Sequence, residues 1–152
     1  MFKKFVSSFL VLLMLCGCGN GSVKKNTADC ATQAEQIVKA LAMEEKMDAV
    51  QGRVIQGLFF FEDDVIQDQA LYIANDKSAD VVGVFIVSNM DSAKASIQTY
   101  LTTLKAQMQN YYPDEVFKID NAVVMNNDTE VILIIANDLE KAKEEAKTLL
   151  GQ

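Results

Sequence analysis

The residues best suited to covalent chemistry in this chain are the cysteines Cys16 and Cys18 near its start. Leu15 lies three residues before Cys18 and Gly17 lies directly before it, which are the residue types that lipoprotein signal peptidase accepts. A small residue is needed at the cleavage position, so bulky Leu15 disfavours cleavage before Cys16. We therefore expect Cys18 to become the first residue of the mature chain, with diacylglycerol and acyl chains attached to it.

The segment before these cysteines has the composition of a signal peptide. Lys3 and Lys4 form a positive n-region, and the run from Phe5 to Leu15 forms an apolar h-region. The run is shorter than the ~20 residues that a retained transmembrane helix needs, which makes that alternative less favoured. Each buried methylene contributes about 0.8 kcal/mol, so two lipid chains hold a domain firmly. We expect removal of residues 1–17 and a lipid-anchored protein on the extracytoplasmic face of the cell membrane.

Histidine, the side chain best suited to proton transfer near neutral pH, is absent from the sequence. Nucleophiles that depend on histidine are therefore excluded, and so are zinc sites built on histidine or on several cysteines. Carboxylate pairs can still hydrolyse glycosidic bonds when burial raises one pKa. The adjacent Glu62, Asp63 and Asp64 lack the apolar setting that this requires. We expect no enzymatic activity, no metal and no cofactor beyond the lipid on Cys18.

Charge narrows the classes of partner. The chain has 14 basic and 21 acidic residues, and loss of Lys3 and Lys4 with the signal leaves a mature net charge near −9. Nucleic acids and anionic lipid headgroups attract basic surfaces, so an acidic domain is poorly suited to bind either. The expected partners are the membrane, through the lipid anchor, and an envelope protein or peptide, with no nucleic acid.

The mature chain divides into a short tether and one domain. Residues 18–27 are small and polar, and a chain of this kind reaches roughly 20 Å. Thr27 or Asp29 can cap a first helix that runs to about Met43, with Cys30 as a small buried hydrophobe on its apolar side. A short helix fits residues 47–61, although its glycines weaken it. Residues 28–152 are long enough for a single domain.

The rest of the domain reads as two strand-strand-helix units. Strands are expected at 69–74, 81–87, 121–125 and 130–136, a long helix from Asp91 or Ser92 to about Asn110, and a last helix after Asn137 or Asp138. The predicted fold is α+β: a four-stranded, mainly antiparallel sheet with helices packed on one face, preceded by the N-terminal helix. Residues 84–94 parallel residues 133–143, through duplication or through shared physical demands.

Two aromatic segments are candidates for a contact patch. Phe59, Phe60 and Phe61 are adjacent and cannot all face one side of a helix or strand. Tyr111 and Tyr112 lie beside a proline and two acids at the end of the long helix. Each segment has a second interpretation, which is packing in the core or against the helix end.

Several segments resemble a known family. They are Ala70-Leu71-Tyr72-Ile73, the strand 82–87, Tyr111-Tyr112-Pro113-Asp114-Glu115 and Asn121-Ala122-Val123-Val124. Over roughly residues 28–150 the chain resembles the Gram-positive bacterial lipoproteins built on domain of unknown function four-three-five-eight, and it departs from them at residues 59–61. The resemblance implies a surface lipoprotein without an assigned activity, and it carries over no catalytic residue.

These observations favour an anchored, non-enzymatic domain that binds a protein or peptide. The alternative is a cell-envelope protein that binds a small molecule, or a carboxylate-dependent hydrolase with two acids facing each other across a pocket.

Overall fold

Five antiparallel strands form one sheet in the order β1-β2-β3-β5-β4. The computed structural model describes residues 28–152; the expected signal peptide, Cys18, the tether and Thr27 lie outside this range. The strands are β1 (Met47–Ala49), β2 (Ile66–Ala74), β3 (Val81–Val87), β4 (Val123–Asn126) and β5 (Glu130–Ile135). The helices are α1 (Cys30–Ala40), α2 (Gly52–Phe59), α3 (Met90–Tyr111), α4 (Val116–Asp120) and α5 (Leu139–Leu150), with a 3-10 turn η1 (Pro113–Glu115) before α4.

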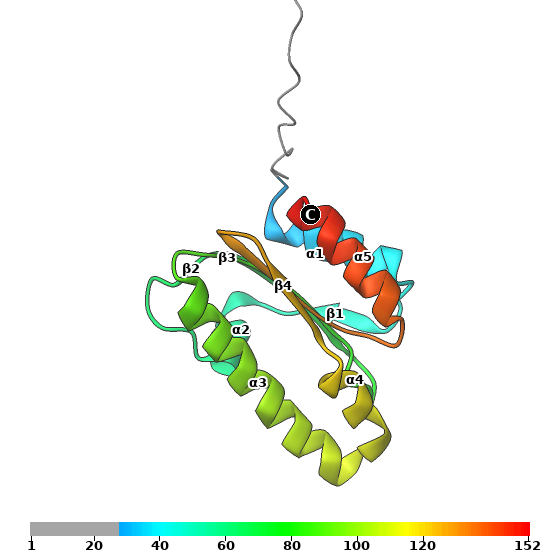
Figure 1. Cartoon of the computed structure of the whole chain (residues 1–152). Coiled ribbons are helices and arrows are strands. Elements are labelled where there is room, and N and C mark those ends of the chain that lie inside the picture. The colour runs from blue at the N-terminus through cyan, green and yellow to red at the C-terminus, as the bar shows by residue number, and fades with distance from the viewer. Residues whose placement is uncertain (1–27) are drawn as a thin grey trace, which may run out of the picture.

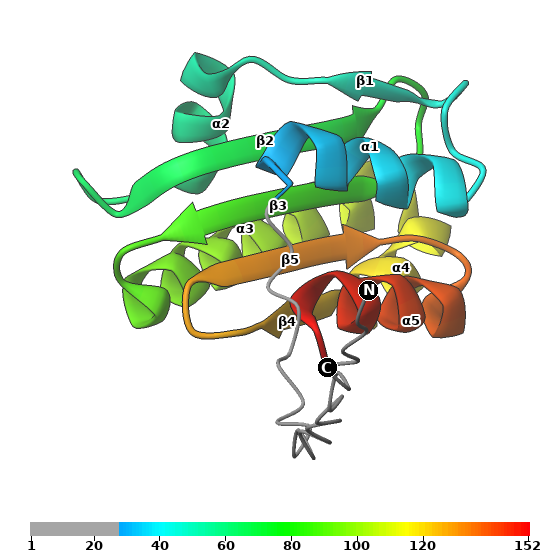
Figure 2. The same cartoon turned by 90° about the horizontal axis from the view of Figure 1, so that it is seen from above.

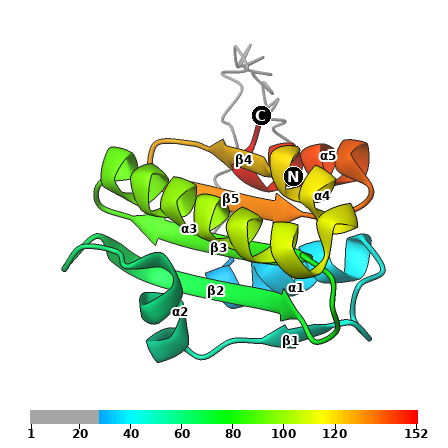
Figure 3. The ribbon, with the colours of Figure 1, turned by 90° about the horizontal axis from the view of Figure 1, so that it is seen from below.

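Helices cover both faces of the sheet (Figure 1). Helices α1 and α5 lie on one face (Figure 2), and α2, α3 and α4 lie on the other (Figure 3). The first core contains Cys30, Ala34, Ile37, Val82, Val84, Ile132, Ile134, Ala142 and Ala146. The second contains Ile55, Phe59, Phe61, Leu71, Val81, Phe85, Ala93, Ile97, Tyr100, Leu133 and Ile135.

The α+β class is confirmed, but two details of the expected sheet are wrong. The sheet has five strands and not four, because the three-residue β1 pairs with β2. The helices pack on both faces and not on one. The reason lies in β3 and β5, whose consecutive residues are apolar, so that each strand needs a cover on either side.

Both strand-strand-helix units exist, as β2-β3-α3 and β4-β5-α5. They have opposite handedness, because α3 and α5 cover opposite faces while β2 and β4 lie on the outer sides of antiparallel β3 and β5. A rotation that superposes β3-α3 on β5-α5 therefore puts β2 on the side of β5 where β3 lies, and not on the side where β4 lies. Phe85 and Ile134, which correspond in the two segments, accordingly face different cores. This geometry favours shared physical demands over duplication as the origin of the similarity.

The three longest helices, α1, α3 and α5, begin at side-chain caps. Asp29 caps α1 by accepting the Thr32 N–H at 2.7 Å, and Asp138, not Asn137, caps α5. Helix α3 begins one residue before the expected Asp91, since Asn89 accepts the N–H of Ser92 at 3.1 Å. The short helix within residues 47–61 is confirmed as α2.

No helix within residues 28–152 combines the length and the apolar composition that would let it cross a bilayer.

Candidate functional site

Helix α3 has an unusually uncharged surface. Its 22 residues include three charged ones, Asp91, Lys94 and Lys105, whereas half of the 12 residues of α5 are charged. From residue 98 to residue 110 its exposed polar side chains are Gln98, Thr99, Thr102, Thr103, Gln107, Gln109 and Asn110. The centres of protein interfaces are likewise depleted in charged residues.

The threonines make this surface less polar than the sequence suggests. The hydroxyls of Thr99, Thr102 and Thr103 donate to the carbonyl oxygens four residues earlier, at 2.9 to 3.0 Å. With their donors used inside the helix, these side chains present mainly their methyl groups to solvent.

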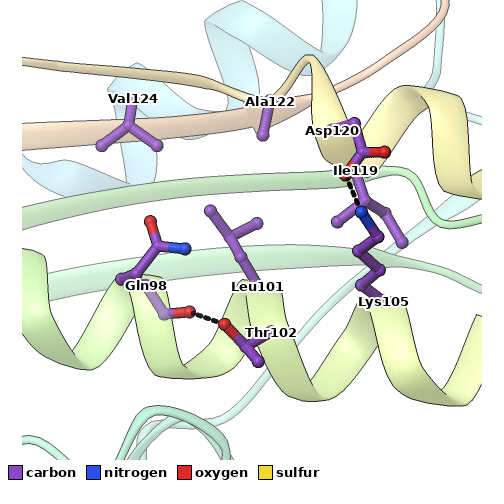
Figure 4. Close-up of a pocket in the computed structure, with 8 residues that line it drawn as sticks. All are labelled: Gln98, Leu101, Thr102, Lys105, Ile119, Asp120, Ala122 and Val124. Carbon is purple, nitrogen blue, oxygen red and sulfur yellow. Dashed lines mark hydrogen bonds and ion pairs between the residues drawn. The ribbon is translucent and has the colours of Figure 1, made fainter.

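A groove of about 400 Å³ separates the middle of α3 from β4 and the end of α4 (Figure 4). We call it the α3–β4 groove; its lining is Gln98, Leu101, Thr102, Lys105, Ile119, Asp120, Ala122 and Val124. Leu101 and Val124 point toward one another across it. Helix α3 lies over the inner strands and leaves this face of β4 bare, so Val124 remains 37% exposed.

One end of the α3–β4 groove is closed by an ion pair. Lys105 Nζ lies 2.5 Å from Asp120 Oδ1, with both side chains about half exposed. The pair neutralises its own charge, and the other lining residues are uncharged. Leu101, Ile119, Ala122 and Val124 give this mostly polar groove an apolar strip, which an aliphatic side chain can contact.

A second hollow of about 260 Å³ lies on the other flank of α3. We call it the Phe60 hollow; its lining is Phe59, Phe60, Glu62, Ser92, Ala95, Ser96 and Thr99. Phe60 is 73% exposed and ends α2 in a left-handed conformation with φ 51°. Its neighbours Phe59 and Phe61 are buried and stack on each other at 5.2 Å between ring centroids.

The five aromatic candidates do not form one patch. Phe59 and Phe61 belong to the core with Phe85, and only Phe60 of that run faces solvent. Tyr111 is 77% exposed and Tyr112 half-buried, both at the far end of α3 from the Phe60 hollow.

The two tyrosines line an open concavity with the β2–β3 turn. Lys77 from this turn lies 5.9 Å from the centroid of the Tyr112 ring, and Asp76 and Ser78 complete that wall. The Tyr112 ring is thus already in contact with a cation of the same chain. Tyr111 is the aromatic side chain here that remains available for a partner.

Carboxylates border one of these hollows from both sides, since Asp76 of the β2–β3 turn and Asp114 and Glu115 of η1 line the open concavity at the tyrosines. The two buried carboxylates, Asp80 and Glu130, sit at opposite ends of the β3–β5 pair, where Val81 faces Ile135 and Ile86 faces Glu130. Asp80 accepts from Lys118 Nζ at 2.7 Å, and Glu130 accepts from Gln33 Nε2 at 2.5 Å. Both are therefore engaged in fixing the fold.

Cys30 is fully buried, as expected for a small hydrophobe. Burial raises the pKa of its thiol far above the usual range, and the nearby Asp68 carboxylate adds to the shift. A thiol in this state is unreactive. No group of three or more acidic or cysteine side chains within residues 28–152 is arranged to hold a metal ion.

Sequence reasoning missed the α3–β4 groove. The low charge of residues 98–110 was a usable signal, since a solvated helix face normally carries acids and lysines. The bare face of β4 had no signal in the sequence, because it depends on where α3 crosses the sheet.

No curated protein and no solved structure matches this chain significantly. A protein-family model, described as Domain of unknown function (DUF4358), matches residues 31–136, which takes in every strand and ends before α5. The match confirms the family that the sequence resembled, and the chain belongs to the DUF4358 family.

Proposed function

We propose that this domain is a non-enzymatic module that binds a protein or peptide, and that lipid on Cys18 holds it at the extracytoplasmic face of the cell membrane. The binding surface is the α3 face, by which we mean the exposed side of α3 with the α3–β4 groove and the Phe60 hollow on its flanks.

Phe60 is the observation that carries this proposal. An aromatic ring exposed to water forgoes its hydrophobic stabilisation, and a left-handed backbone at a residue with a Cβ costs about 1 kcal/mol more. Glycine would avoid both costs at this helix end. Strained and exposed aromatic residues of this kind are typical of contact sites.

The direction in which the chain enters the domain supports the same surface. Ala28, the first residue that the structure describes, leads into α1, which lies in the layer with α5 (Figure 1). Helix α3 forms the opposite layer. An anchor attached ahead of Ala28 would thus leave the α3 face accessible to a partner.

Site-specific photocrosslinking in cells tests this function. A photoreactive amino acid replaces Phe60 or Thr103 on the α3 face, or Lys141 on α5 as a matched exposed control. Thr103 lies outside the groove lining, so a larger side chain there leaves the α3–β4 groove open. We expect a discrete crosslinked product from Phe60 and Thr103 and none from Lys141. Equal products from all three positions, or none from any, would contradict binding through the α3 face.

Binding of a small molecule is the second candidate, because the volume of the α3–β4 groove lies within the range of ligand pockets. The α3–β4 groove is shallow, and Asp120 is the one acid in its lining, so this groove does not offer the pair of acids that hydrolysis needs. A small molecule bound in the α3–β4 groove would shield Leu101 and Val124 from solvent, and the photocrosslinking experiment would then give no crosslinked protein.

A further inference from the structure

We propose that the partner enters the α3–β4 groove as an extended segment that pairs with β4 and continues the sheet as a sixth strand. This inference rests on the proposed binding function and adds the mode and the chemistry of binding. The segment that fits is uncharged in its middle, with aliphatic side chains beside Leu101 and Val124, and carries Lys or Arg at the end near Asp128.

The two edges of the sheet differ in their protection. Strand β1 contains Asp48 and directly follows Glu44, Glu45 and Lys46, and charges of this kind deter pairing with another strand. Strand β4 reads Val-Val-Met-Asn, with neither a charge nor a proline. The edge beside the α3–β4 groove thus lacks the charges that protect the β1 edge.

The register shows which backbone groups of β4 are available. The N–H of Asn127 donates to the carbonyl of Glu130 at 3.0 Å, which marks these two residues as a hydrogen-bonded pair. Such pairs alternate along an antiparallel ladder, so Val124, opposite Leu133, belongs to a pair without mutual hydrogen bonds. The N–H and carbonyl of Val124 therefore point away from β5.

The far end of this edge is occupied within the chain. The side-chain amide of Gln152 donates to the carbonyl of Asn126 at 2.8 Å. Val124, two residues earlier, is consequently the centre of the open part of the edge. A strand that pairs there places its side chains beside Val124, where alternate ones point into the α3–β4 groove.

Charge supports a cationic segment. The described residues contain 10 lysines and arginines against 21 acids. Asp128 lies just after β4 and is exposed at the β4–β5 turn, whereas the charge of Asp120 before β4 is already balanced by Lys105. A segment with a basic end near Asp128 and an uncharged middle matches this arrangement of charges.

The test uses the full acylated chain in detergent micelles and a displayed library of linear peptides of about nine residues, which is longer than a typical strand of about five to six. Peptides selected on the chain are measured again on Val124→Pro, which removes the outward N–H while leaving the ladder to β5 intact. We expect affinity to fall about tenfold, as for loss of one backbone hydrogen bond and its neighbours. Hydrogen exchange of the Val124 and Asn126 amides should slow when the peptide binds.

The matched control is Ala49→Pro on the other edge. In the β1–β2 ladder the N–H of Asn75 donates to the carbonyl of Lys46, and the N–H of Val50 donates to the carbonyl of Leu71. Hydrogen-bonded pairs alternate along the ladder, so the N–H of Ala49 also points outward. Peptide affinity should be unchanged by Ala49→Pro. Equal losses in both variants, or no loss with Val124→Pro, would overturn pairing at β4.

A second pair of variants keeps the test valid if Val124→Pro fails to fold. Thr102→Trp fills the α3–β4 groove from the solvent side. Thr103→Trp adds the same ring at the next residue, which does not belong to the groove lining. Only Thr102→Trp should weaken the peptides. If the library yields no peptide sensitive to either groove variant, strand pairing is wrong, while the crosslinks from Phe60 decide separately whether the α3 face binds.

Discussion

The ammonium group of Lys118 lies 2.7 Å from Asp80 Oδ1, and both side chains are less than 10% exposed. The same ammonium lies 2.5 Å from Glu115 Oε2, which also accepts the N–H of Ala79 at 2.7 Å. Burial alone would lower the Lys118 pKa, but the two carboxylates outweigh it and the pKa is raised. This cluster fastens the corner after α3 to the start of β3.

Lys118→Met should therefore destabilise the domain by about 3 kcal/mol or more, because it leaves two carboxylates without their buried cation. The matched control is Lys39→Met, which removes an exposed ion pair with Glu35 and should change stability far less, because water screens that pair. Urea denaturation measures both. Similar midpoints for the two variants would contradict a stabilising role for the cluster.

Alkaline pH should unfold the protein in part through Tyr100. Burial raises the pKa of Tyr100 from 10.0 to about 12. Below pH 10 the phenol is neutral in both states; between pH 10 and 12 it ionises first in the unfolded state, so stability falls as pH rises, by about 2 to 3 kcal/mol. Tyr100→Phe should reduce this loss in denaturation curves at pH 9 and 11, whereas Tyr111→Phe, at an exposed site, should not.

Gly83→Ala should destabilise the sheet by about 1 to 3 kcal/mol through overpacking. A Cβ at Gly83 would lie 2.8 Å from Cε2 of Phe85 and 3.3 Å from Cδ1 of Leu71. The Phe85 ring cannot swing aside, because Phe59 and Phe61 pack against it edge-on. Thermal unfolding checks this, with Gly57→Ala as the control, since a Cβ there meets no atom within 4 Å. A drop in melting temperature for Gly57→Ala alone would refute the packing argument.

Phe60→Gly should raise stability and lower binding at once. Glycine relieves the left-handed backbone at this position, a gain of up to about 1 kcal/mol. Removal of the exposed ring should reduce the crosslinked product obtained from Thr103. Denaturation and crosslinking are measured on the same variant, and full retention of the crosslink would show that Phe60 makes no contact with the partner.

Cys18→Ala should abolish acyl labelling of the chain and release it from the membrane fraction. The reason is that the thiol is the point of attachment for the diacylglycerol. Cys16→Ala, two residues earlier, serves as the control and should keep the label. Acyl label that persists in the Cys18→Ala variant would disprove lipid attachment at Cys18.

The sequence was informative where local chemistry decides the structure. The strand Val81–Val87 has the expected bounds, α3 ends before Pro113 because proline restricts the residue ahead of it, and Asp29 and Asp138 cap their helices as side chains of their type do.

It failed where contacts between distant residues decide. Strand β1 is too short for a periodic pattern and exists through its pairing with Ile73 and Tyr72. Helix α4 and the turn before it depend on the buried bond from Lys118 to Asp80. The same limit applies to the α3 face, since the exposure of Phe60 between two buried phenylalanines follows from how α2 ends.

The strand order has a consequence for how the protein acquires its structure. The two central strands, β3 and β5, come from distant parts of the chain, and β3 remains an open, wholly apolar edge until residues 130–135 arrive. A polypeptide that emerges amino end first, from a ribosome or across a membrane, leaves that edge unpaired until residues 130–135 have followed. The pairing of β5 with β3 is therefore the late, non-local step on which closure of the sheet depends.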